Sequence, residues 1–213
     1  MTVAQYDPLY VAAGAQSGIP AAFIRAIVSR ESGGNPKATP KASSSAAARG
    51  LMQVTGVVRI DYNRRHATNV QPDDLWDPST NVRIGSDLLA RIVDAYRATG
   101  IAGLQPDWKD RRWVELVSLG YGAGYSAGSG VLFVAKALAK EGRAISADSV
   151  AAQAATLPGA YAELYRPAKV AWCKGTAAVY FGAPAAPSGP SSGGSGSGVL
   201  LLALAVLVAM EAK

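Results

Sequence analysis

Residues 19–36 read IPAAFIRAIVSRESGGNP, and this stretch decides the interpretation of the whole chain. Ile24, Ile27 and Val28 recur at helical spacing, which predicts an amphipathic helix from about residue 20 to the glycines at 33 and 34. Glu31 follows Ile24 by seven residues and Ile27 by four. The carboxylate therefore shares the apolar stripe that should face the core.

This position favours a protonated carboxyl group on Glu31. Burial removes the hydration of a carboxylate, and the negative end of the helix dipole opposes its charge in the last turn. Both effects predict that Glu31 keeps its proton near neutral pH, which is the state that a general acid requires. The periodicity alone also allows Glu31 to cap its helix end or to pair with a nearby arginine.

The rest of the chain predicts a mostly α fold. Asp7-Pro8 is typical of a helix start, and Thr80 is a plausible cap for the helix after it. We expect helices over residues 80–98, 112–120, 131–141, 149–155 and 160–180, the last interrupted at Pro167. Runs with strand periodicity are missing, so the sheet content should be small.

The composition excludes several classes of site. The chain has 213 residues, of which 49% are hydrophobic, and a net charge of +6. Because the Lys and Arg residues are dispersed, they indicate ordinary solvated charges, and no nucleic acid is expected as a partner. A single cysteine and a single histidine exclude a disulfide and a multi-Cys metal site, and we expect no metal and no cofactor. We expect Cys173 to be a small core residue and His66 a surface side chain.

The C-terminal part departs in composition from the rest. Residues 184–198 are rich in Pro, Gly and Ser and predict a flexible linker after a domain over residues 1–183. Residues 199–213 should form a short apolar C-terminal helix, in which the apolar run 199–210 reaches only about 18 Å at 1.5 Å per residue. That is short for a bilayer core of about 30 Å. We expect it to contact a membrane or a virion protein, and we expect no N-terminal secretory signal peptide.

Four motifs follow one another in an informative order. They are Glu31-Ser32 with Asn35-Pro36, then Ala48-Arg49-Gly50-Leu51-Met52-Gln53-Val54, then Asp77-Pro78 with Asn81, and finally Gly120-Tyr121-Gly122-Ala123-Gly124. Together they resemble the catalytic domain of the soluble lytic transglycosylases, which has a lysozyme-like fold. A weaker match over residues 161–170 offers either Tyr161 or Tyr165 as the closing tyrosine of that family. One departure is Gly122, where the family has an asparagine.

The resemblance implies that a single carboxylate cleaves the glycan strands of peptidoglycan. Glu31 would protonate the oxygen between N-acetylmuramic acid (MurNAc) and N-acetylglucosamine (GlcNAc), and then assist closure of a 1,6-anhydro ring. The substrate-binding candidates are Ser32, Met52, Gln53, Tyr121 and Tyr165. Gln53 would hold the N-acetyl group or a hydroxyl, and Met52 would form an apolar wall unless it is a core residue. Ser32 is placed for a structural role at the helix end and not for that of a nucleophile.

Two other classes stay open at this point. A hydrolase of the lysozyme type would need a second carboxylate, for which Asp61, Asp73, Asp74 and Asp77 are the candidates. A non-catalytic wall-binding or structural virion protein would explain the loss of the asparagine at Gly122. We expect the enzyme to act on periplasmic peptidoglycan from a phage virion or within the bacterial cell envelope, with a phage the favoured origin.

Overall fold

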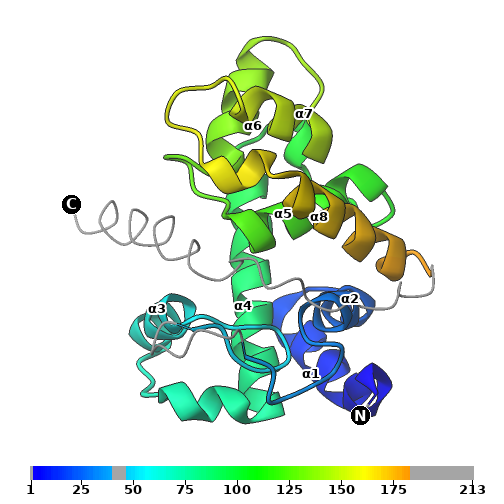
Figure 1. Cartoon of the computed structure of the whole chain (residues 1–213), viewed down its shortest axis with the longest axis vertical. Coiled ribbons are helices and arrows are strands. Elements are labelled where there is room, and N and C mark those ends of the chain that lie inside the picture. Colours follow the sequence, from blue (N-terminus) through cyan, green and yellow to red (C-terminus); the bar gives the residue numbers. More distant parts are fainter. Residues whose placement is uncertain (1, 40–46, 183–213) are drawn as a thin grey trace. The chain divides into compact units, whose positions relative to one another are not determined.

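The computed structural model describes residues 2–39 and 47–182 (Figure 1). The predicted linker over residues 184–198 and the apolar segment over residues 199–213 lie outside these residues. The described chain is helical, without a named strand, and an isolated bridge pairs Arg49 with Val54. Its helices are η1 (Val3–Tyr6), α1 (Asp7–Ser17), α2 (Ala21–Glu31), α3 (Gly56–His66), η2 (Pro72–Trp76), α4 (Pro78–Arg97), η3 (Ala102–Leu104), α5 (Arg111–Ala123), α6 (Val131–Lys140), α7 (Ala147–Ala154), η4 (Ala162–Tyr165) and α8 (Pro167–Tyr180).

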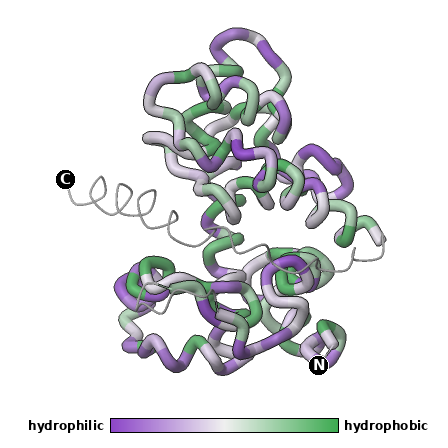
Figure 2. Tube along the Cα trace, in the orientation of Figure 1, coloured by the Kyte–Doolittle hydropathy of each residue, from purple (hydrophilic) through white to green (hydrophobic). Residues whose placement is uncertain are grey.

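These helices form two compact units. Of the described residues, the first unit contains 2–39, 47–90 and 178–182, and the second contains 91–177. Hydrophobic and hydrophilic positions alternate along the helical turns of both (Figure 2). Within the described ranges, no helix has the length and apolar character needed to cross a membrane.

In the first unit, α1 and α2 pack together. Pro8 stands in the first turn of α1, as predicted, and Gly18 ends that helix in the left-handed conformation at φ 72°. On α2, the predicted stripe of Ile24, Ile27 and Val28 is fully buried, each side chain being 0% exposed. The helix predicted from the apolar stripe before Glu31 is therefore present, and its stripe faces the core.

Helix α3 was not expected from the sequence, because its composition is polar and its apolar stripe is weak. It is stabilised instead by ion pairs, in which Arg65 bridges the carboxylates of Asp61 and Asp87. His66 is exposed, as predicted, but its Nε2 lies 2.9 Å from Asp87 Oδ1, and its ring stacks on Tyr62 with 4.3 Å between the ring centroids. Charge pairing thus replaces hydrophobic periodicity in this helix.

Helix α4 begins earlier than predicted. The carboxylate of Asp77 accepts a hydrogen bond from the backbone N–H of Thr80 at 2.8 Å, so Asp77 is the residue that caps the first turn. Thr80 is not the cap. The predicted apolar stripe of α4, which comprises Leu88, Leu89, Ile92, Val93 and Tyr96, is buried along its whole length.

The second unit is built around α5. Trp113, Leu116 and Val117 of this helix are at most 2% exposed, and α6, α7 and η4 pack against it. Pro167 stands at the first position of α8, after η4 has ended, so the predicted interruption is present. The core of this unit also contains Cys173, which is 0% exposed, as predicted.

Cys173 should be unreactive in the folded protein. Burial, followed by the nearby charge of Glu115, raises the pKa of the thiol to about 12, and the thiol donates to the backbone oxygen of Val170 at 3.0 Å. Because only the thiolate attacks a disulfide reagent, we expect no reaction with Ellman's reagent at pH 8 until urea unfolds the chain. The variant Ala171→Cys places a thiol at an exposed neighbouring position and should react at once, one equivalent per chain. Rapid labelling of the unmodified chain would contradict the burial of Cys173.

Candidate active site

The candidate catalytic carboxylate stands where the sequence predicted. Glu31 is the last residue of α2 and is half-buried, on the stripe of fully buried apolar residues. Ser32 follows it, and its hydroxyl donates to the backbone oxygen of Val28 and accepts from the backbone N–H of Gly34, both at 3.2 Å. These two bonds hold the end of the helix, so Ser32 has the structural role expected of it.

A short series of hydrogen bonds connects this helix end to the Gln53 loop, residues 49–54. The backbone N–H of Asn35 donates to Ser32 at 3.1 Å, and that of Ala38 donates to Asn35 at 3.1 Å. The oxygen of Ala38 then accepts from the backbone N–H of Gly50 at 3.0 Å and from the side chain of Gln53 at 2.8 Å. Glu31, Ser32 and Gln53 therefore belong to one connected part of the first unit.

Gln53 is held in an uncommon backbone conformation, with φ at 50°. Its side-chain nitrogen donates to the backbone oxygens of Ala38, at 2.8 Å, and Gly50, at 2.9 Å. An amide nitrogen has two protons to donate, so both are used within the protein. The side-chain oxygen is the group of Gln53 that is left to accept an N–H or O–H from a sugar.

The side chain of Asn81, in α4, holds the Gln53 loop by hydrogen bonds. This side chain is 0% exposed. Its oxygen accepts the backbone N–H of Met52 at 2.8 Å, and its nitrogen donates to the backbone oxygens of Arg49, at 2.7 Å, and Leu75, at 2.9 Å. The close approach requires Gly50, where φ is 76° and a Cβ would lie 2.3 Å from the Asn81 nitrogen. Gly50 is thus required because any larger residue would collide with Asn81.

Met52 does not offer the sugar wall that the sequence suggested. Its side chain is 0% exposed, and its sulfur lies where a side chain at Gly85 of α4 would begin, 2.5 Å from the position of that Cβ. Met52 is therefore a core residue that fastens the loop to α4, which was the alternative left open. An apolar side chain such as Met52 suits either a sugar wall or a core position. The course of the loop backbone, which turns Met52 toward α4, decides for the core position.

Two of the predicted tyrosines belong to the second unit. Tyr121 lies in the last turn of α5 and is 6% exposed. Tyr165 is 41% exposed, whereas Tyr161 is half-buried and its backbone N–H donates to the oxygen of Ser129 at 2.9 Å. Burial, followed by the charge of Glu163, raises the pKa of Tyr161 to about 12. The structure thus anchors Tyr161 more firmly than Tyr165.

Sequence reasoning passed over Glu163, which is 5% exposed. One carboxylate oxygen accepts from Arg166 at 2.6 Å, and the other has no hydrogen-bond partner among the described residues. Buried polar atoms are usually hydrogen-bonded, so a buried carboxylate oxygen without a partner among the described residues is unusual. Its only sequence signal is its place in the weak match over residues 161–170.

The departure at Gly122 has a physical cause in the second unit. A Cβ at this position would lie 3.2 and 3.3 Å from two ring carbons of Trp172, so the indole of α8 occupies the space of a side chain. The glycine-rich stretch that follows is ordered, because Ser126 accepts the backbone N–H groups of Ser129, at 3.3 Å, and Gly130, at 3.2 Å. This stretch leads directly into α6.

Of the four aspartates that are candidates for the second carboxylate of a hydrolase, three have other tasks. Asp61 is 3% exposed and pairs with Arg65 at 3.0 Å. Asp74 accepts the backbone N–H of Gln71 at 2.7 Å, and Asp77 caps α4. The side chain of Asp73 is 89% exposed.

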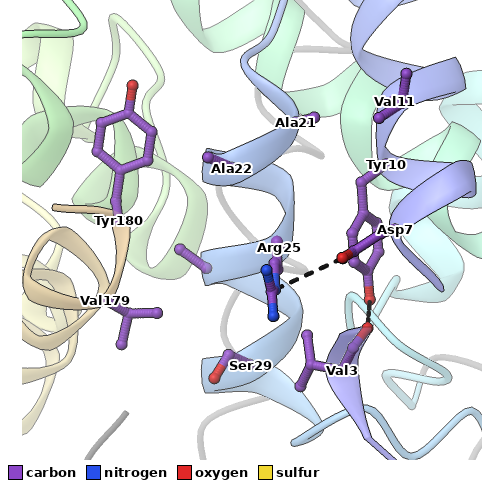
Figure 3. A pocket seen from close by; sticks show the side chains of 11 residues that line it. Val3, Asp7, Tyr10, Val11, Ala21, Ala22, Arg25, Ser29, Val179 and Tyr180 are labelled. Atoms are coloured by element: carbon purple, nitrogen blue, oxygen red, sulfur yellow. Dashed lines mark hydrogen bonds and ion pairs between the residues drawn. The ribbon is translucent and has the colours of Figure 1, made fainter. Parts of the chain in front are cut away.

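A separate pocket of about 630 Å³ is lined on the α2 side by residues that include Ala22, Arg25 and Ser29 (Figure 3). Arg25 on its wall lies 3.6 Å from Asp7, and the hydroxyl of Tyr10 donates to the backbone oxygen of Val3 at 3.1 Å. The pocket contains none of the predicted site residues. Its position, about a third to half a turn around α2 from Glu31, separates it from the Gln53 loop.

The helical architecture and the motif geometry together define a lysozyme-like domain. The profile of the transglycosylase SLT domain matches residues 8–143, and the chain therefore belongs to that family. Glu31, Gln53 and Tyr121 lie inside the matched range, whereas Tyr161 and Tyr165 lie beyond it. The predicted family and the predicted fold class, mostly α and lysozyme-like, are confirmed.

A solved structure supports the fold. The chain is similar to the 70 kDa soluble lytic transglycosylase of Escherichia coli, with a TM-score of 0.52 and 21% sequence identity. The match covers 83% of this chain and 24% of that protein. The chain thus spans about a quarter of the length of this larger protein.

Replacing Asn81 should release the Gln53 loop. Asn81→Ala leaves one buried N–H and two buried carbonyls without their partner, and we expect a loss of about 3 kcal/mol or more in the free energy of unfolding. Urea unfolding followed by circular dichroism measures it. The exposed Asn69→Ala is the matched control and should change stability by less than about 0.5 kcal/mol. Equal effects of the two substitutions would show that the loop does not depend on Asn81.

Restoring the family asparagine should require removal of the indole. We expect Gly122→Asn to destabilise the protein by about 1–2 kcal/mol through overpacking. In the Trp172→Ala background the same substitution should be neutral or stabilising, because the ring that it meets is gone. Thermal unfolding of the four proteins gives the coupling energy. A penalty of equal size in both backgrounds would mean that Trp172 does not exclude the side chain.

Proposed function

We propose that this chain cleaves the β-1,4 bond between MurNAc and GlcNAc in peptidoglycan and forms 1,6-anhydro-MurNAc, with Glu31 as both acid and base. The observation that carries the proposal is the connected series of hydrogen bonds from the Glu31 helix end to Gln53. It places one carboxylate and one amide oxygen in the same rigid part of the protein. The engagement of Asp61, Asp74 and Asp77 elsewhere favours this reaction over hydrolysis.

The reaction needs one carboxyl group in two protonation states. Glu31 donates its proton to the glycosidic oxygen as the bond to the anomeric carbon of MurNAc breaks, and GlcNAc leaves with a free hydroxyl. The N-acetyl group of MurNAc stabilises the positive charge that develops at this carbon. The carboxylate then removes the proton of the 6-hydroxyl, whose oxygen bonds to the anomeric carbon, and Glu31 recovers its proton.

The surroundings of Glu31 suit this cycle. Half-burial on an apolar stripe and the helix C-terminus both favour the neutral acid before the first step. Gln53 is fixed through its nitrogen, so its oxygen can accept the N–H of the N-acetyl group without reorganisation. Tyr121 belongs to the second unit, and the supporting contact that the resemblance implies for it stays a prediction.

Mass spectrometry of digested peptidoglycan tests the proposal. The unmodified protein should release anhydro-muropeptides, and Glu31→Gln should slow their release by about 10²–10⁴-fold, the usual contribution of a general acid–base group. Glu141→Gln removes an exposed carboxylate elsewhere and should retain activity. Thermal unfolding of each variant establishes that it is folded. Reducing-end products would identify a hydrolase, and binding without products would identify a wall-binding protein.

We also propose that the activity serves local opening of the cell wall, in phage entry or in assembly of a secretion machine. Support comes from the sequence of the apolar run over residues 199–210, which follows a stretch rich in Pro, Gly and Ser and suits contact with a membrane or a virion protein. Flotation with lipid vesicles compares the full chain with a chain that ends at residue 183. Co-flotation of the full chain alone supports membrane contact, and equal behaviour of the two chains excludes it.

A further inference from the structure

Two cations and one indole form a cluster at the edge of the Gln53 loop. Lys37 Nζ and the guanidinium carbon of Arg49 each lie 5.5 Å from the centre of the Trp76 ring. The three residues come from different segments: the turn after α2, the Gln53 loop itself and the end of η2. We call Lys37, Arg49 and Trp76 the cationic cluster. Each cation is within the distance at which an aromatic face attracts it.

The cluster is joined to the candidate site by short covalent and hydrogen-bonded paths. Lys37 precedes Ala38, whose backbone oxygen accepts from both Gly50 and Gln53. Arg49 precedes Gly50, and its own backbone oxygen accepts from Asn81 at 2.7 Å. The backbone of both cations is therefore fixed relative to Gln53. A substrate group that reaches the cluster lies close to the loop that binds the sugar.

One donor of the Arg49 side chain has no hydrogen-bond partner among the described residues. The side chain is 16% exposed, and this donor is its buried Nη1. The carboxylate oxygen of Asp73 lies 3.9 Å from this nitrogen, beyond hydrogen-bond distance, on a side chain that is 89% exposed. Asp74 and Asp77 of the same segment are turned to the backbone N–H groups of Gln71 and Thr80.

We propose that the cationic cluster is a subsite for a carboxylate of the substrate strand. An arginine matches the geometry of a carboxylate, and a neighbouring lysine adds a second positive charge. In peptidoglycan this carboxylate belongs either to the lactyl ether of MurNAc or to the stem peptide. The inference rests on the proposed function, because it takes the glycan to lie along the Gln53 loop.

Binding measured with three ligands tests the subsite. In the Glu31→Gln background, which does not consume substrate, calorimetry compares glycan strands stripped of peptides, strands that carry stem peptides, and uncharged chitooligosaccharide. Lys37→Met should weaken binding of the charged strands by about threefold, as expected for an exposed ion pair. Arg49→Gln should weaken it by about tenfold or more, as expected for a charged hydrogen bond. Binding of the neutral ligand should change less than about twofold.

Two further variants extend this test: one is expected to strengthen binding, and the other is a control. Asp73→Asn removes the carboxylate that lies 3.9 Å from Arg49 and should strengthen binding of the charged strands. Arg64→Gln removes the same charge from α3, where the guanidinium is paired with Asp61, and should have little effect. A defect confined to stripped strands identifies the lactyl carboxylate, and one confined to stem-bearing strands identifies the peptide.

Equal losses for charged and neutral ligands, or no loss with Lys37→Met and Arg49→Gln, would overturn the subsite and leave the cluster a purely structural clamp. This outcome is separate from failure of the proposed function. That failure appears as missing anhydro products from the unmodified protein, whereas the charge dependence is measured without turnover.

Discussion

The hydrogen bonds of the Asn81 side chain are the constraint on which the candidate site depends. This one amide satisfies a backbone N–H and a backbone oxygen of the Gln53 loop, which has no regular secondary structure of its own, and a backbone oxygen of η2. A buried loop without such partners would be unstable, since each unpaired polar group there loses its hydration without compensation. With Asn81 in place, the loop can be both buried at Met52 and open at Gln53. Helix α4 thus supports the Gln53 loop through Asn81.

The fold was predictable wherever helices have an apolar stripe. The stripes of α2 and α4 gave their positions from the sequence, and Pro167 gave the interruption before α8. Helix α3 escaped, because its stability comes from Arg65, Asp61 and Asp87, and ion pairs between helices leave no periodic pattern in the sequence. The start of α4 was misplaced for a related reason: both Asp77 and Thr80 can cap a helix, and only the backbone path chooses between them.

The site was predictable to the extent that a motif fixes chemistry. Glu31 could be found from its position on an apolar stripe, because a carboxylate there is energetically unusual. The direction of the Gln53 amide could not, since it depends on the backbone oxygen of Ala38, fifteen residues away. Met52 is apolar, which suits a sugar wall as well as a core. The meaning of Gly122 depends on Trp172, which lies fifty residues later and carries no motif.

The chemical nature of the supporting groups matters as much as their position. The groups that connect the Glu31 helix end to the loop are backbone amides and the neutral side chains of Ser32 and Gln53. Neutral donors and acceptors fix geometry without strongly favouring the ionised carboxyl group, whereas a lysine or arginine in their place would hold Glu31 as a carboxylate. The cations Lys37 and Arg49 are instead retained by the face of Trp76. The proposed combination of one acid–base carboxylate with a charged polymer substrate fits this arrangement, in which neutral hydrogen bonds fix the Gln53 loop and the two cations stand at its edge.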